Sequence, residues 1–217
     1  MDTPENPPPA GGASVRAEMS DLLHLARLAL AFGRVDRVTL HPDEALRESD
    51  TDHTVMLALV APALAAQLRP DLCPALVCTF AVVHDLVEVK TGDTNTIGIT
   101  AAGRAEKAAR EAAALVELRV ELAAFPWLVD TLDRYEAQVE PEARWVRYID
   151  KVLPKLTHAL NRGAALRLMG KSADEFRADG ARQREQLRAE YPEFPEADLL
   201  LWQAVEVAEA ACIGQQP

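Results

Sequence analysis

Residues 81–96 read AVVHDLVEVKTGDTNT, and they place two polar side chains, His84 and Asp85, inside an apolar run. The apolar spacing around them predicts a helix over about residues 74–90. An imidazole and a carboxylate buried in an apolar layer are costly unless they meet a partner or a metal ion. The stretch therefore indicates a helical fold with a polar site inside its core.

Helical spacing of apolar residues continues on both sides of this stretch. The first expected helix ends near Gly33, with a buried face made of Met19, Leu22, Leu23, Ala26 and Leu30. The polar residues 34–51 are expected to form an irregular connection. The other expected helices cover residues 51–68, 74–90, 101–124, 127–138, 142–162, 172–190 and 196–212. No segment alternates over a sustained length, so we predict an all-α, single-domain helical bundle.

Composition agrees with packed helices. The chain has 217 residues, of which 49% are hydrophobic but only 5% aromatic. A β-sandwich or barrel would need more aromatic and β-branched side chains. The Pro- and Gly-rich residues 1–14 are expected to be a disordered tail, and residues 15–217 one domain.

Charge and hydropathy exclude several classes of protein. The chain carries 34 acidic and 23 basic residues, a net charge of -11, which disfavours binding to a nucleic-acid polymer. The longest apolar run, Val55–Ala66, is 12 residues long and contains Pro62, too short to span a membrane. The three cysteines lack a disulfide framework and the start lacks a signal peptide, so a cytoplasmic protein is expected.

Metal-ligand residue types recur in two further segments. His53 opens the second expected helix, and Asp150 lies in the helix WVRYIDKVLPKL. Two imidazoles and two carboxylates suit one divalent cation such as Mn²⁺, Co²⁺, Fe²⁺ or Zn²⁺. Glu88 lies one helical turn after His84, and a turn at Thr91-Gly92 brings Asp93 toward the same place. Both carboxylates stand where a general acid or base belongs.

The order His53, His84-Asp85, Asp150 resembles that of the HD-domain superfamily of metal-dependent phosphohydrolases. The longer run HDLVEVKTGD, residues 84–93, is similar to the branch that contains bacterial 5′-deoxynucleotidases. The resemblance implies an all-helical fold of the HD type, one divalent metal ion held by these four residues, and catalytic roles for Glu88 and Asp93. It also implies nucleoside monophosphate substrates and a homodimer.

Positive side chains near these residues are candidates for binding phosphate. Arg34 matches an arginine that grips phosphate in similar nucleotidases, whereas Val35 replaces the tryptophan that crowds the ribose 2′ position there. Lys151 and Lys155 lie one turn apart beside Asp150, which suits a phosphate-binding face. Further candidates are Arg37, Arg47 and Lys90.

Three functions remain open from the sequence. The first is a 5′-(deoxy)nucleotidase, and the second a deoxynucleoside triphosphate triphosphohydrolase (dNTPase) with the same metal ligands. A third, of another class, is a non-catalytic nucleotide-binding regulatory module. Hydrolysis of a guanosine alarmone is disfavoured, because Val89 interrupts the HD-x-x-E-D run expected for it. A single histidine on an apolar helix is more often a packed core residue, so the prediction rests on the ordered set.

Overall fold

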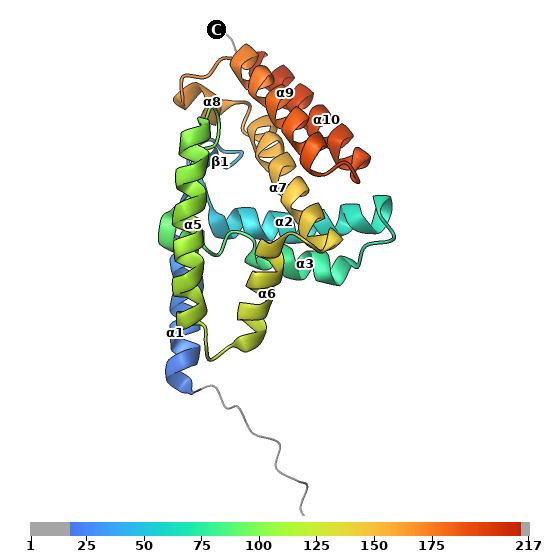
Figure 1. Ribbon diagram of the computed structural model, residues 1–217. Helices are drawn as coiled ribbons and strands as arrows, with labels where there is room; N and C mark the ends of the chain where they lie inside the picture. The colour runs from blue at the N-terminus through green and yellow to red at the C-terminus, as the bar shows by residue number, and fades with distance from the viewer. Residues whose placement is uncertain (1–17, 214–217) are drawn as a thin grey trace, which may run out of the picture.

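The computed structural model describes residues 18–213, which Figure 1 shows coloured along the chain. The tail expected over residues 1–14 lies outside these residues, and the domain extent of 15–217 stays a prediction. Within the described part, ten helices accompany one two-stranded sheet, so the predicted all-α fold class is confirmed.

Most of the helices match those expected from apolar spacing. The elements are α1 (Met19–Phe32), β1 (Asp36–Leu40), β2 (Arg47–Ser49), α2 (Asp50–Leu68), α3 (Pro74–Val83), α4 (Glu88–Thr91), α5 (Ala101–Glu121), α6 (Pro126–Ala137), α7 (Pro141–Leu160), α8 (Ala164–Leu168), α9 (Ala173–Glu190) and α10 (Pro195–Ile213). Thr100 caps α5 as expected, by accepting a hydrogen bond from the Gly103 amide. No helix in these residues is both long and apolar enough to cross a membrane.

Helix α7 lies at the centre of the core. It packs against α10 on one side and against α2 and α3 on the other. Trp145, Ile149 and Leu153 on α7 are fully buried, which the apolar stripe of this helix predicts. Figure 1 shows α9 and α10 lying side by side next to α7, with α1 and α5 along the opposite edge of the molecule. Asp150 is thus carried into the interior by the most buried helix.

The connection over residues 34–51 is not irregular, as the sequence predicted, but contains an antiparallel hairpin. Strand β1 pairs with β2 in a register that joins Asp36 to Ser49 and Leu40 to Arg47. Strands of five and three residues with charged side chains are too short for alternation to be visible in the sequence. The second expected helix begins at Asp50, and its cap is Ser49, whose side chain accepts from the Asp52 amide.

The single helix predicted over residues 74–90 is also divided in two. Helix α3 ends at Val83, and α4 begins at Glu88 after a turn built from bonds between residues three apart, such as Leu86 N to Val83 O. The His84 ring nitrogen Nδ1 bonds the carbonyl oxygen of Ala81 at 2.8 Å, in competition with the backbone amide that would continue the helix. The His-Asp pair therefore lies at a break rather than inside a helix.

The predicted buried face of the first helix is wrong. Leu23 is 51% exposed and Leu30 71%, whereas Leu28 and Phe32 are the buried residues of α1. A helical apolar stripe becomes buried only where another element covers it. Helix α1 lies at the edge of the molecule and packs chiefly on the short α4, so most of its apolar side chains meet no cover within the described chain.

Candidate metal centre

Four residues from three segments bring their ligand atoms together. His53 comes from the first turn of α2, His84 and Asp85 follow α3, and Asp150 comes from the middle of α7. Their candidate ligand atoms all lie within 4.8 Å of one another. His53 Nε2 is 2.9 Å from Asp150 Oδ1, and His84 Nε2 is 2.9 Å from Asp85 Oδ2. The fold thus joins positions that are up to 97 residues apart in the chain.

The chemistry of this cluster fits a bound cation. The bond from His84 Nδ1 to Ala81 assigns the ring proton to Nδ1, so the buried Nε2 presents a lone pair and has no hydrogen-bond partner in residues 18–213. A lone pair and a carboxylate oxygen 2.9 Å apart repel each other unless a positive charge lies between them. Two nitrogens and two carboxylates around such a point suit a divalent transition metal.

Glu48 on β2 supports the first of these histidines. Its Oε1 lies 3.7 Å from His53 Nδ1, and its Oε2 accepts a hydrogen bond from the Thr39 hydroxyl. Burial alone would lower the pKa of His53, but the hydrogen bond with Asp150 and the nearby carboxylate of Glu48 raise it to about 9. A carboxylate beside Nδ1 favours the tautomer whose Nε2 is free to bind metal. The hairpin that the sequence did not predict therefore takes part in the site.

Arg37 on β1 joins the carboxylates around the cluster. Its Nη1 is 2.9 Å from Asp50 Oδ1, 3.1 Å from Asp85 Oδ2 and 3.9 Å from Glu88 Oε2. Burial lowers the pKa of Arg37, but Asp85 and Asp93 raise it above its ordinary value, so the guanidinium stays charged. The structure does not bring Arg34 into this group, because that side chain is exposed and does not line the cavity.

Glu88 is almost fully buried at the start of α4. Burial and the charge of Asp85 raise its pKa to about 9, although Lys107 on α5 opposes the change with its Nζ 2.9 Å from Glu88 Oε1. The other oxygen, Oε2, has no hydrogen-bond partner in the described chain. Burial also raises the pKa of Asp93, which lines the same cavity. Burial and the neighbouring negative charges therefore favour the protonated form of Glu88.

Three cations at intervals of four residues follow one face of α7. Lys151 Nζ is 2.6 Å from Asp150 Oδ2. Lys155 is 5% exposed and forms no ion pair or side-chain hydrogen bond within residues 18–213, and burial lowers its pKa to about 8. Arg147 lies on the same face, four residues before Lys151. The sequence analysis did not select it, although the same four-residue spacing could have identified it. His158, one turn later, stays neutral because burial and Lys155 lower its pKa to about 4.

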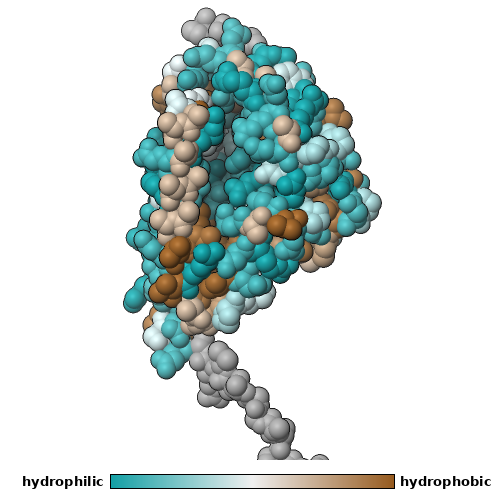
Figure 2. Space-filling model, in the orientation of Figure 1, coloured by the Kyte–Doolittle hydropathy of each residue, from teal (hydrophilic) through white to brown (hydrophobic). Residues whose placement is uncertain are grey.

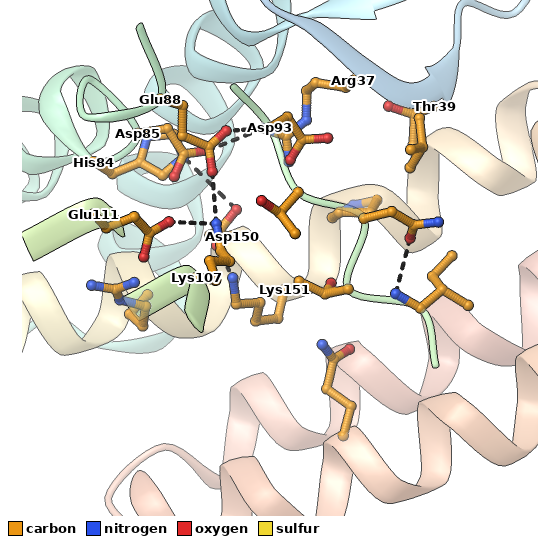
Figure 3. Close-up of a pocket in the computed structure, with 18 of the residues that line it drawn as sticks. Arg37, Thr39, His84, Asp85, Glu88, Asp93, Lys107, Glu111, Asp150 and Lys151 are labelled. Carbon is orange, nitrogen blue, oxygen red and sulfur yellow. Dashed lines mark hydrogen bonds and ion pairs between the residues drawn. The ribbon is translucent and has the colours of Figure 1, made fainter. Parts of the chain in front are cut away.

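Most of these groups, though not His53, Glu48 or Asp50, line a cavity of about 100 Å³. Figure 3 shows the carboxylates of Asp85, Glu88 and Asp93 on the same side as Arg37, with Lys107 bonded to Glu88 and Lys151 below them near Asp150. Two further cationic candidates from the sequence lie outside it. Arg47 is exposed, and Lys90 pairs with Glu121.

Comparison with known proteins points to one family. No curated protein matches the chain. A solved structure described as a predicted metal-dependent phosphohydrolase from Magnetospirillum magnetotacticum MS-1 is 22% identical, with a TM-score of 0.63 over 88% of this chain and 98% of that one. A conserved hypothetical protein from Pyrococcus furiosus is 21% identical, with a TM-score of 0.47 over 63% of this chain and 79% of that one.

The likeness to the Magnetospirillum structure shows a shared fold. Residues 34–191, the greater part of the chain, match the HD domain and include all four clustered ligand residues. The chain therefore belongs to the HD domain family.

Proposed function

We propose that this protein is a metal-dependent phosphohydrolase that removes the phosphate from nucleotides, as a 5′-(deoxy)nucleotidase acting on nucleoside monophosphates. One observation carries the proposal: His84, Asp85 and Asp150 of the four-residue metal cluster line a small cavity together with a buried lysine that has no anionic partner in the described chain. Membership of the HD domain family supports metal-dependent hydrolysis, and the similar Magnetospirillum protein bears a phosphohydrolase description.

The residues that would hold the ion are His53, His84, Asp85 and Asp150. One divalent cation (Mn²⁺, Co²⁺, Fe²⁺ or Zn²⁺) bound there supplies Lewis-acid polarisation of a phosphate oxygen and makes a water molecule more acidic. Glu48 keeps the ring of His53 in the orientation that this role needs.

Positive side chains bind and orient the phosphate. Lys155 is buried without a partner, and a phosphate oxygen would give it one. Lys151 and Arg37 add charge on two other sides of the cavity, and the arginine fork fits two oxygens of one phosphate. Since the protein is acidic overall, these basic side chains together with a bound divalent cation would supply the positive charge that an anion needs.

Glu88 acts as the general acid and Asp93 as the general base. Water attacks phosphorus, the bond from phosphorus to the ester oxygen breaks, and Glu88 gives its proton to the leaving alkoxide. Burial and the charge of Asp85, which favour the protonated carboxyl, suit Glu88 to that step. Asp93 accepts the proton that the attacking water loses, and Lys107 keeps the Glu88 carboxyl in place through Oε1.

The test is phosphate release from a panel of nucleotides with Mn²⁺ or Co²⁺, before and after chelation. We expect activity in the wild type, none after chelation, and none in Asp85→Asn, whereas the exposed Arg34→Ala retains it. Equal phosphate release by the wild type and Asp85→Asn would overturn the proposal. Tripolyphosphate as the product from a triphosphate would indicate a dNTPase instead, and tight nucleotide binding without turnover would indicate a regulatory module.

A further inference from the structure

A second group of metal-ligand side chains comes together next to the metal centre. Asp50 at the start of α2, Asp85 after α3 and Glu88 at the start of α4 each bring one carboxylate oxygen within 4.8 Å of the others. Oxygens on opposite sides of one bound ion are roughly 4.4 Å apart, so this spacing is close to that of ligands sharing a cation. Asp85 belongs to both groups, which makes them neighbours.

A cation of the chain itself lies among these three carboxylates. Arg37 Nη1 is 2.9 Å from Asp50 Oδ1, 3.1 Å from Asp85 Oδ2 and 3.9 Å from Glu88 Oε2. Three oxygens from three segments thus face one nitrogen. Figure 3 shows Arg37 on the same side of the cavity as Asp85 and Glu88. The guanidinium nitrogen therefore stands at the place that a bound ion would take.

The carboxylates offer more ligand oxygens than Arg37 satisfies. Nη1 has two N–H groups, and it bonds Asp50 and Asp85 with them. Glu88 Oε2 is left without a hydrogen-bond partner in residues 18–213, as is Asp50 Oδ2, and both residues are at most 3% exposed. Unpaired buried oxygens are unfavourable, and a divalent ion with several ligands would satisfy more of them than one nitrogen does.

We infer that Asp50, Asp85 and Glu88 form a second cation site, and that Arg37 fills this site in place of a second metal ion. A set of ligands made only of oxygen suits Mn²⁺ or Mg²⁺. Without the guanidinium, the three buried carboxylates would keep Lys107 as a cationic neighbour, and Lys107 bonds the other oxygen of Glu88. A divalent ion from solution should then take the place of the arginine.

The second site lies next to solvent-accessible space. Arg37, Asp85 and Glu88 line the small cavity, whereas Asp50 is fully buried and does not. Figure 2 shows a hollow among hydrophilic residues beside α5, the helix from which Lys107 also lines this cavity. Shortening the side chain of Arg37 should therefore open a path for an ion from the cavity to Asp50.

In the proposed phosphohydrolase, Arg37 supplies the charge of a second ion permanently. Two-metal hydrolases use a pair of ions to stabilise the attacking and the leaving oxygen. Because Nη1 is held by Asp50 and Asp85, the other guanidinium nitrogens stay available for a phosphate. This role rests on the proposed function, whereas the cation site itself does not depend on hydrolysis.

The test counts Mn²⁺ ions per chain, by equilibrium dialysis of the full chain and elemental analysis. Arg37→Ala should bind one ion more than the wild type. Arg37→Lys keeps the charge, and Arg34→Ala changes an exposed arginine three residues earlier, so both should bind as many ions as the wild type. Arg37→Ala/Asp50→Leu should not bind the extra ion, because one ligand is lost.

Two further measurements locate the ion and cover a failure to fold. Since Asp85 would be shared by both ions, the paramagnetic resonance spectrum of Mn²⁺-loaded Arg37→Ala should show a spin-coupled pair, whereas that of the wild type should show isolated Mn²⁺. If Arg37→Ala unfolds in metal-free buffer, Mn²⁺ should restore its helical circular dichroism signal, because the ion replaces the missing charge. Failure of excess Mn²⁺ to refold it would overturn the inference.

The outcomes separate the inference from the proposed function. Equal Mn²⁺ content of Arg37→Ala and the wild type overturns the inference, whether or not the protein hydrolyses nucleotides. An extra ion with the spectrum of isolated Mn²⁺ also overturns it, because that ion lies elsewhere. A spin-coupled extra ion that disappears in Arg37→Ala/Asp50→Leu supports the inference. A wild type that binds Mn²⁺ but releases no phosphate from any nucleotide refutes only the proposed function.

Discussion

Replacing Lys155 by methionine should make the protein more stable and its binding of phosphate weaker. The side chain is 5% exposed and has no anionic partner in residues 18–213, so its charge is held in the core at a cost. Methionine has a similar length and volume but no charge, so it fills the same space. Residues kept for function at the expense of stability behave in this way.

The size of the effect follows from the pKa. Burial lowers the pKa of Lys155 from 10.5 to about 8, and this difference corresponds to about 3 kcal/mol of unfavourable interaction for the charged form. At pH 7 the lysine is charged in both the folded and the unfolded protein, so the full penalty applies. Lys155→Met should raise the free energy of unfolding by up to about 3 kcal/mol.

The gain should depend on pH with a definite sign. The folded protein loses the proton of Lys155 at a lower pH than the unfolded chain does, so the penalty shrinks as the pH rises from about 8 to 10.5. The difference in unfolding free energy between Lys155→Met and the wild type should therefore be constant below pH 8. It should fall toward zero near pH 10.5.

Urea unfolding of the metal-free protein, followed by circular dichroism at several pH values, measures this difference. Lys151→Met is the matched control, because Lys151 is part-exposed and pairs with Asp150, so its loss should not stabilise the fold. The same Lys155→Met variant should lose about tenfold or more in kcat/KM for a nucleotide, as a contact to a charged phosphate is removed. A Lys155→Met protein that is less stable at pH 7, or a difference independent of pH, would refute the reasoning.

Three further predictions concern other parts of the molecule. Arg37→Met should destabilise the fold by about 3–5 kcal/mol in urea unfolding, because it leaves buried carboxylates unpaired. The control, Arg34→Met at an exposed position, should change the free energy of unfolding by less than about 0.5 kcal/mol. Equal effects would contradict the placement of these two arginines. Glu48→Gln should weaken metal binding about 10- to 100-fold in a competition titration with a chromophoric chelator, through the orientation of His53, and unchanged affinity would exclude that role. The expected homodimer stays a prediction, to be checked by light scattering: Leu23→Glu on the uncovered apolar side of α1 should convert a dimer to a monomer, and a wild-type monomer would show that this surface has another role.

The local pattern of the chain determined the helical class and the residues of the metal cluster. Apolar spacing is a property of neighbouring residues, so helices such as α5, α7 and α9 could be predicted near their observed bounds. The ligand types His53, His84, Asp85 and Asp150 could be selected because imidazole and carboxylate groups among apolar residues need a polar partner or a metal ion. That these four meet is a consequence of the fold.

Only the tertiary structure decided which arginine enters the site and where helices end. Arg34 and Arg37 are three residues apart and chemically alike, and pairing in a short hairpin turns Arg37 toward Asp50 and Asp85 while Arg34 stays exposed. The break after Val83 depends on a ring nitrogen that competes for a backbone carbonyl, which spacing does not reveal.

The remaining features arise between segments that are distant in the chain. The stripe on α1 could be recognised as apolar, but burial requires a covering element, and none lies over most of it within residues 18–213. A cavity of about 890 Å³ is lined by residues of α5, α7 and α9, so its existence could not be predicted from local sequence patterns. Sequence thus determined the chemistry available to this protein, and packing decided which groups share a site, because distances between remote residues exist only in the folded chain.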